Sequence, residues 1–151
     1  MSKSSRTLTL EKVLAAEKNI HELDLGSFDA IELPAFEALS QRKHYLNLSG
    51  LLSLSDEEAA AFAKHNGILD LSGVKEISDI AASRLATMKG GLWLNGLARL
   101  SDKAAAALST HEGDLYLWGL TELTPAADKA LSKHNIFRVH SQIKIREKDA
   151  K

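Results

Sequence analysis

The hydrophobic positions of the chain recur every 23 residues, as the step from Leu46 to Leu69 shows. Four consecutive repeats begin YLNLSGLLSLS, ILDLSGVKEIS, GLWLNGLARLS and DLYLWGLTELT, at residues 45, 68, 91 and 114. When they are aligned, four apolar columns stand in register, and the first column holds Leu46, Leu69, Leu92 and Leu115. A repeat of this length predicts a stacked architecture, because a single unit cannot bury its apolar face alone.

Within each repeat the period of the apolar residues changes. The LxLxGL segment alternates apolar and polar residues, which predicts a short strand followed by a turn. After the fourth apolar column the spacing becomes helical, as at Ala82 and Leu85. A Ser or Thr stands where each helix should begin, and the expected N-caps are Ser55, Ser78, Ser101 and Thr124. Glycines are expected to end three helices in the left-handed conformation, at Gly67, Gly90 and Gly113.

The pattern extends in both directions from these four repeats. Residues 22–44 fit the same columns, so we expect five repeats over residues 22–135. Residues 9–21 resemble the helical half of a repeat without its strand, and they are predicted to form an N-terminal capping helix. Further along, the columns fit again once one residue is deleted, which predicts capping strands over 136–146 and a tail over 147–151.

Together these elements predict one α/β domain over residues 1–151. Parallel strands should form one wall of the stack and helices the other, which gives a right-handed β/α solenoid. Strands lie about 4.8 Å apart, whereas helix axes need about 8–10 Å. Because of this mismatch the stack should curve, with the strands on its concave face and the helices on its convex face.

The repeat resembles that of the leucine-rich-repeat family, and it is similar to bacterial forms with an LxLxGLxxLS motif. The resemblance covers about residues 9–140 and departs from the family's pattern at one position. Three residues after the second strand leucine the family usually carries Asn or Cys, which satisfies backbone groups of the turn. Here an apolar residue stands in that place, at Phe28, Leu51, Val74, Leu97 and Leu120. The turn is therefore expected to satisfy its hydrogen bonds in another way.

Alternation assigns the aromatic residues to two different faces. The four phenylalanines fall in core columns, whereas both tyrosines and both tryptophans fall on the outward strand face, as Tyr45, Trp93, Tyr116 and Trp118. Trp93 and Tyr116 hold equivalent positions in adjacent repeats, so they should be neighbours. Rings on a sheet surface can simply stabilise it. Exposed Trp and Tyr residues that lie close together are also typical of an interaction site.

The rest of the outward face is acidic and polar toward its N-terminal end. Asp70 and Asn95 belong to it, and Arg138 and His140 continue the columns of Tyr116 and Trp118. We expect a non-enzymatic module that binds a protein or peptide through the four aromatic residues and these four neighbours. Two alternatives use the same surface: a carbohydrate-binding module, and a structural element that associates with another copy of itself. The face has no basic stripe, which argues against nucleic acid.

Composition narrows the function further. The net charge is −1 and 44% of the residues are hydrophobic, so the chain should fold without attracting nucleic acid or anionic lipid. The absence of cysteine excludes disulfides and thiolate metal sites. The chain contains no familiar catalytic or cofactor-binding motif, so neither an enzyme nor a cofactor is expected. There is no signal-peptide pattern and no apolar run of membrane-spanning length, so we expect a cytoplasmic protein.

Three histidines share one column of the repeat, at His65, His111 and His134. A metal site is one interpretation of this column. Met88 stands in the same column, however, which favours a packing position near the end of each helix. We therefore expect no metal there.

Overall fold

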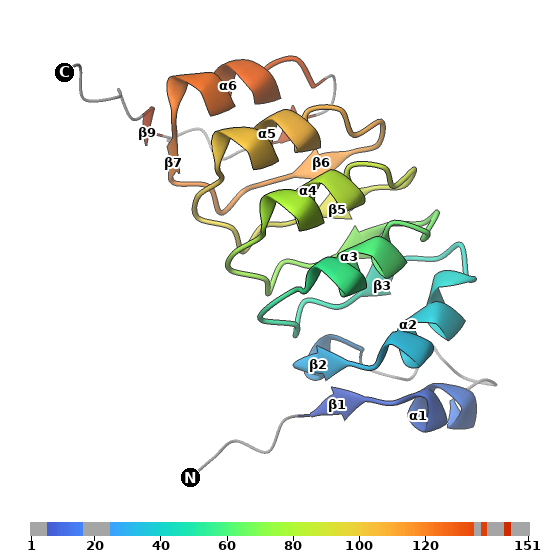
Figure 1. Cartoon of the computed structure of the whole chain (residues 1–151). Coiled ribbons are helices and arrows are strands. Elements are labelled where there is room, and N and C mark those ends of the chain that lie inside the picture. Colours follow the sequence, from blue (N-terminus) through green and yellow to red (C-terminus); the bar gives the residue numbers. More distant parts are fainter. Residues whose placement is uncertain (1–5, 17–24, 135–136, 139–143, 146–151) are drawn as a thin grey trace, which may run out of the picture.

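Strands and helices alternate along the chain in the order that the repeats predict (Figure 1). The computed structural model describes residues 6–16, 25–134, 137–138 and 144–145. Its helices are α1 (Leu10–Ala15), α2 (Leu33–Ser40), α3 (Asp56–Phe62), α4 (Asp79–Leu85), α5 (Asp102–Leu108) and α6 (Pro125–Leu131), and a 3-10 helix, η2, spans Leu25–Ser27. Its strands are β1 (Thr7–Leu8), β2 (Ala30–Ile31), β3 (Leu46–Asn47), β4 (Leu69–Asp70), β5 (Leu92–Trp93), β6 (Leu115–Tyr116), β7 (Glu122–Leu123), β8 (Phe137–Arg138) and β9 (Lys144–Ile145).

One parallel sheet joins the strands of the central repeats, in the order β3-β4-β5-β6-β8. Phe137 pairs with Leu115, which confirms the one-residue deletion predicted for the C-terminal end of the pattern. The register aligns the first apolar column across the whole sheet, in the row Leu46, Leu69, Leu92, Leu115 and Phe137. The chain is therefore an α/β protein built from repeated strand–helix units around a parallel sheet, as predicted.

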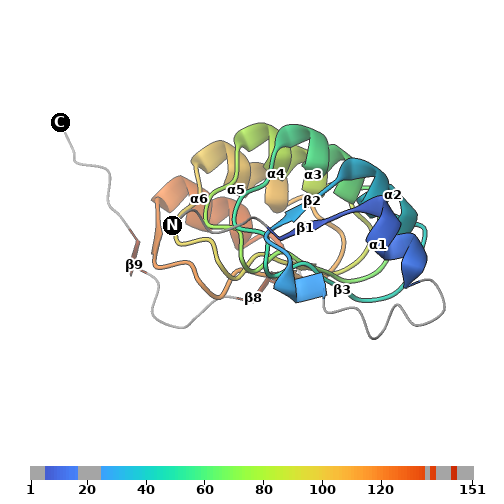
Figure 2. The same cartoon turned by 90° about the horizontal axis from the view of Figure 1, so that it is seen from below.

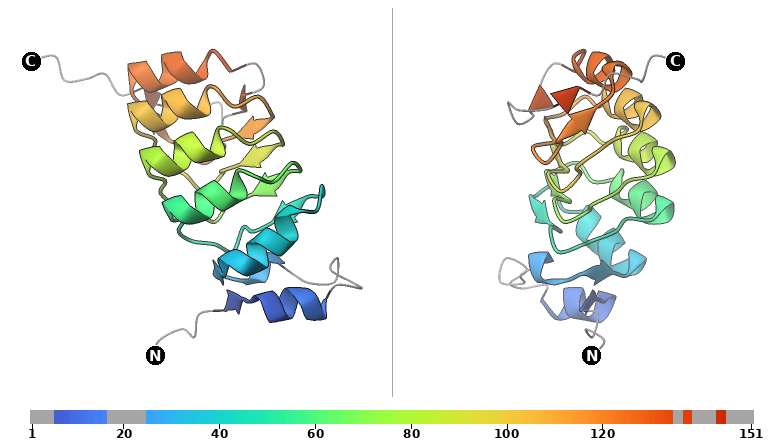
Figure 3. Two further views of the ribbon diagram at one scale, coloured as in Figure 1. Left: turned by 45° about the vertical axis from the view of Figure 1, so that its right-hand side comes forward. Right: turned by 90° about the vertical axis from the view of Figure 1, so that its left-hand side faces the viewer.

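Helices α2 to α6 lie on one side of this stack and the main sheet lies on the other (Figures 2 and 3). Each of these helices packs on the helix of the preceding repeat. Small side chains face inward here: Ala81, Ala82, Ala104 and Ala105 are all fully buried. Between the two layers, the leucines of the first two columns in the repeats of β4, β5 and β6 are fully buried too. Burial of a leucine side chain contributes about 1.5–3 kcal/mol, so these columns supply much of the stabilisation.

Two further strand pairs lie at the fourth apolar column, where β1, β2 and β7 come directly before helices. β1 pairs with β2 through Leu8 and Ile31, and β7 pairs with β9 through Leu123 and Ile145. The N-terminal half-repeat therefore has a strand, although the pattern predicts none. At the other end, β9 confirms that a further strand lies within residues 136–146.

The N-terminal part differs from the prediction in two more places. Helix α1 ends at its C-cap, Ala16, so it is shorter than the predicted helix over 9–21, whose residues 17–21 lie outside the described residues. Leu25–Ser27 form the 3-10 helix η2 at the positions that make an ordinary turn in the later repeats, and the preceding strand positions, residues 23–24, lie outside the described residues. The Phe28 N–H donates to the Leu25 carbonyl at 3.3 Å and closes this turn.

In the later repeats the turn after the strand is closed by backbone and side-chain hydrogen bonds. The Leu51 N–H donates to the Leu48 carbonyl at 3.0 Å, and the other three repeats make the same backbone bond. The Asn47 Oδ1 accepts from the N–H of Ser49 at 3.0 Å. In the next repeat the Asp70 Oδ1 accepts from the N–H of Ser72 in the same way, so both turns are Asx turns. These bonds take the place of the Asn or Cys that the turn lacks.

The periodic glycines are required for a reason other than the predicted one. None of the nine glycines has a positive φ, and the helices end earlier, at the C-caps Ala63, Ala86 and Ser109. The predicted left-handed helix ends are therefore wrong. A Cβ on Gly90 would lie 1.8 Å from the carbonyl oxygen of Gly67, and one on Gly113 would lie 2.2 Å from that of Gly90. Glycine is needed because the backbones of successive repeats touch here.

The predicted N-caps are all confirmed, and three of them also connect adjacent repeats. The side chains of Ser55, Ser78, Ser101 and Thr124 each accept a hydrogen bond from a backbone N–H of the helix that follows. The Ser78 hydroxyl also donates to Oδ1 of Asp56 in the preceding repeat, at 2.5 Å. The same bond joins Ser101 to Asp79 and Thr124 to Asp102. We call these three pairs the Asp–hydroxyl ladder.

Candidate binding surface

The outward aromatic residues Tyr45, Trp93, Tyr116 and Trp118 form one continuous aromatic strip. The ring centroids of Tyr45 and Trp93 lie 5.5 Å apart, and those of Trp93 and Tyr116 lie 5.4 Å apart. The rings of Tyr116 and Trp118 follow at 6.2 Å. Trp93 and Tyr116 are paired across β5 and β6, so the predicted neighbours are confirmed. The strip also includes Tyr45, which lies two repeats before Trp93.

The two ends of the strip are open to solvent. Tyr45 is 47% exposed and Trp118 is 55% exposed, whereas Trp93 and Tyr116 are half-buried between them. Trp93, Tyr116 and Trp118 line a shallow hollow of about 480 Å³ together with Asn95. We call it the aromatic hollow. Successive rings of the strip are inclined by 51°, 63° and 56°, so they do not share one plane.

Asp70 lies beneath the N-terminal half of the strip and is only 7% exposed. Its Oδ2 accepts a hydrogen bond from the Tyr45 hydroxyl at 2.9 Å, and its Oδ1 accepts from the N–H of Ser72. Burial and the contact with this carboxylate raise the pKa of Tyr45 to about 12. Both oxygens of Asp70 are thus engaged within the chain. In this geometry Asp70 positions Tyr45 and closes a turn.

Asn95 fixes the backbone at Trp118. Its Oδ1 accepts a hydrogen bond from the Trp118 N–H at 3.0 Å, across the boundary between two repeats. In two earlier repeats the equivalent N–H is bonded by Asn47 or Asp70 of the same repeat. Tyr116 stands in that position in the last repeat, and its ring offers no such acceptor. Alternation of the sequence shows which way Asn95 points, but it gives no sign of this bond.

Three further residues belong to the outward face by the alternation of the sequence. Arg138 lies in β8 and pairs with Tyr116, as its column predicts. His140 lies outside the described residues. Asp114, two residues before Tyr116, is exposed and makes no ion pair with any described residue.

The histidine column lies inside the molecule. His65 is fully buried, and its Nε2 lies 2.9 Å from the carbonyl oxygen of His44. Met88 takes the same place in the repeat between those of His65 and His111; it is 1% exposed and belongs to the hydrophobic core. In the part of the chain that the structure describes, no three potential metal ligands come together.

The environment of His111 changes its titration. It is 4% exposed, and its ring stacks on that of His134 with centroids 6.1 Å apart. Burial lowers the pKa of His111, although the carbonyl groups of Ala86 and Gly90 act in the opposite direction. A neutral imidazole is therefore the favoured form inside the folded protein.

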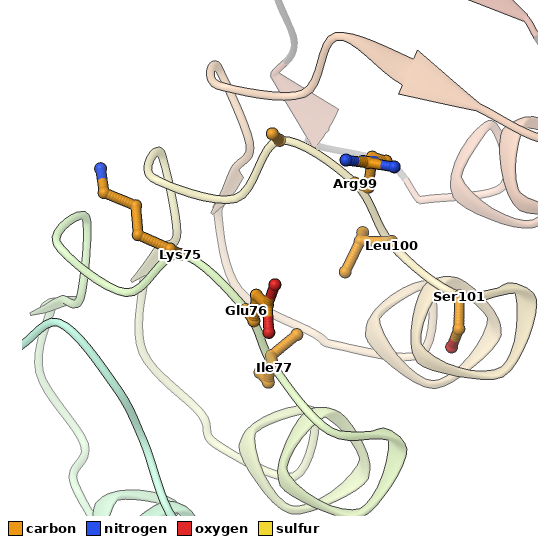
Figure 4. Close-up of a pocket in the computed structure, with 7 residues that line it drawn as sticks. Lys75, Glu76, Ile77, Arg99, Leu100 and Ser101 are labelled. Atoms are coloured by element: carbon orange, nitrogen blue, oxygen red, sulfur yellow. The ribbon is translucent and has the colours of Figure 1, made fainter.

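A second hollow, of about 640 Å³, lies on the segments that lead into α4 and α5 (Figure 4). Its lining includes the charged residues Lys75, Glu76 and Arg99, which the sequence pattern does not single out. In the close-up the Lys75 side chain extends away from Glu76 and Arg99. The lining carries charges of both signs, so the hollow has no uniform charge that would select an anion or a cation.

Comparison of the chain with protein-family models, with curated proteins and with solved structures found no match. Among the described helices, none combines the length and the apolar character that crossing a bilayer requires.

Proposed function

We propose that this protein is a non-enzymatic repeat module that binds a protein or peptide partner along the aromatic strip. The observation that carries the proposal is that all the Trp and Tyr residues of the chain form one connected surface. Trp and Tyr are the residues that most often dominate binding energy at protein interfaces. A chain that uses them only for packing would be expected to place some of them in its core.

Neighbouring residues support the proposal because they hold the aromatic strip in place. The Tyr45 hydroxyl is fixed by Asp70 and the backbone at Trp118 is fixed by Asn95. A partner that binds rings held in this way loses little conformational entropy at the interface. The strip also crosses adjacent parallel strands, which suits an extended segment more than a compact small molecule.

A carbohydrate remains the second candidate, because Trp118 is more than half exposed and one ring is enough to stack on a sugar. The inclination of the rings, 51° to 63°, argues against a flat platform for a long sugar chain. Self-association through the strip is the third candidate. We further propose that the repeats form a right-handed solenoid of the leucine-rich-repeat type and that the module works in the cytoplasm.

The test is affinity capture with purified protein, followed by reconstitution with each purified candidate partner. Trp118→Ala should abolish the capture, whereas Ile80→Ala should not, because Ile80 lies in α4 and is similarly exposed, at 54%. Trp118→Ala should cost about 1 kcal/mol or less in stability, since ring pairs contribute about 0.5–1.5 kcal/mol each. Equal binding by Trp118→Ala and the wild type would contradict the proposal.

Two controls separate the alternatives. Saturable binding of a sugar in a glycan panel, lost in Trp118→Ala, would replace the peptide by a carbohydrate. Concentration-dependent sedimentation of the wild type alone, lost in the same variant, would favour self-association.

A further inference from the structure

We propose that the aromatic hollow takes an alkylated ammonium group, such as a methylated lysine side chain of the protein partner. This inference rests on the proposed function and adds the chemistry of the group that the surface recognises. It is carried by the tilt and spacing of three rings, by the charge around them and by the shortage of free acceptors in the hollow.

The tilt of the rings is the first argument. Trp93 and Tyr116 are inclined by 63°, and Tyr116 and Trp118 by 56°. Planes that meet at such angles form a corner, which surrounds a rounded group better than a flat one. A tetrahedral alkylammonium is rounded, and recognition of such groups by several aromatic rings is an established use of the cation–π attraction.

The spacing of the rings allows two of them to attract one cation. The attraction acts when the cation lies within about 6 Å of a ring centroid. The centroids of Trp93 and Tyr116 are 5.4 Å apart and those of Tyr116 and Trp118 are 6.2 Å apart. A group seated above the midpoint of either pair is therefore within reach of both rings. The volume of the hollow, about 480 Å³, leaves room for such a group.

The charge around the hollow also favours a cation. Its four lining residues are Trp93, Asn95, Tyr116 and Trp118, and none of them carries a positive charge. Asp114 adds an exposed carboxylate two residues before Tyr116 on the same face of the sheet. Arg138 pairs with Tyr116 in the next strand, and the Asp114 carboxylate opposes its positive charge near the hollow without filling it.

The shortage of acceptors selects the alkylated form. An unmodified lysine brings three N–H donors, and each of them needs an acceptor once it leaves water. Among the side chains that line the hollow, the acceptors are the Asn95 Oδ1, which already accepts the Trp118 N–H, and the Tyr116 hydroxyl. Alkylation removes donors and adds apolar surface while it keeps the charge, so the alkylated cation leaves fewer hydrogen bonds unsatisfied.

The test uses choline and its neutral isostere 3,3-dimethyl-1-butanol at matched ionic strength. Both tryptophans of the chain line the hollow, so intrinsic tryptophan fluorescence reports on this surface alone. We expect choline to cause a saturable change in the millimolar range and to bind about tenfold more tightly than the neutral alcohol. Trp118→Leu should weaken this preference, because only the Trp93–Tyr116 pair is left. Trp118→Phe should keep more of it, and Ile80→Ala should keep all of it.

A second experiment, with peptides, identifies the molecule that supplies the cation. A trimethyllysine peptide is expected to bind more tightly than the same peptide with lysine. Equal affinity for choline and the alcohol would overturn the proposal, and so would binding of phosphatidylcholine vesicles without binding of the peptide. If a partner is captured through Trp118 but choline does not compete with it, the alkylammonium inference fails and the proposed function stands.

Discussion

At the residue scale, the hydrogen bond from the Tyr45 hydroxyl to Asp70 can be tested by measuring the pKa of Tyr45. The folded protein holds the pKa of Tyr45 at about 12, so its phenolate should appear only near that pH. Replacement by Asp70→Asn removes the nearby negative charge, and the pKa should move down toward the ordinary value of about 10. Absorbance at 295 nm in a Tyr116→Phe background, where Tyr45 is the only tyrosine, measures both values. Titration of Tyr45 near pH 10 in the parent protein would show that the bond is absent.

The buried His111 predicts how stability depends on pH. Its pKa is lower in the folded state than in the unfolded state, so the folded state binds fewer protons. The stability that this histidine supports is present above about pH 6.5 and is lost as the pH falls below that value. His111→Met should reduce this loss, because Met88 shows that the column accommodates methionine. Urea unfolding at pH 7 and pH 5 measures the change, and Met88→His is expected to steepen it. An unchanged loss in His111→Met would assign the acid sensitivity to another group.

Much of the strip could be predicted from the sequence, because alternation decides which side of a strand a residue faces. Trp93, Tyr116 and Trp118 were expected on one face for that reason, and the register brings them together. Alternation does not predict that Asp70 holds the Tyr45 hydroxyl or that Asn95 holds the backbone at Trp118. Each depends on a side-chain hydrogen bond between repeats, and the period of the sequence carries no information about such distances.

At the scale of the element, two adjacent glycines test why glycine recurs. A Cβ on Gly90 would meet backbone, 1.8 Å from the Gly67 carbonyl oxygen. A Cβ on Gly91 would instead lie 3.3 Å from the exposed side chain of Ile68, which can move. We therefore expect Gly90→Ala to cost about 3 kcal/mol or more, and Gly91→Ala to change stability by about 0.5 kcal/mol or less.

Urea unfolding of the two variants provides the comparison. Equal costs would mean that the loss arises from chain entropy or local geometry and not from contact between repeats. The sequence predicted where these glycines recur but assigned them to helix ends, because contact between the backbones of neighbouring repeats leaves no local signal.

At the scale of the whole molecule, the uniform register predicts that one repeat can be removed. Deletion of residues 68–90 joins two equivalent positions and leaves the apolar columns aligned, so the shorter chain should fold cooperatively. Its urea m-value should fall by about 15%, in proportion to the 23 of 151 residues removed. Deletion of residues 68–79 shifts the columns and should prevent folding. Similar behaviour of both deletions in circular dichroism and urea unfolding would contradict the stacked model.

The period alone predicts the strand order of the main sheet, but it does not predict the strand pairs at the two ends of the stack. At each end a strand pair at the fourth apolar column accompanies an incomplete repeat, β1 with β2 and β7 with β9. Among the described residues, Leu54, Ile77 and Leu100 stand in the same column without forming strands, so the restriction of these pairs to the two ends is a property of the whole stack. A pattern read within one repeat cannot reveal it.

The Asp–hydroxyl ladder has a direction, and this has a consequence for how the chain is made. In each pair the carboxylate belongs to the earlier repeat and the hydroxyl to the later one, as with Asp79 and Ser101. A ribosome releases the earlier repeat first. Each emerging helix start therefore meets an acceptor that is already in place, so assembly should proceed vectorially from the N-terminal side. Hydrogen exchange on chains truncated from either end would reveal this: early repeats should be protected without the later ones, and late repeats should not be protected without the early ones.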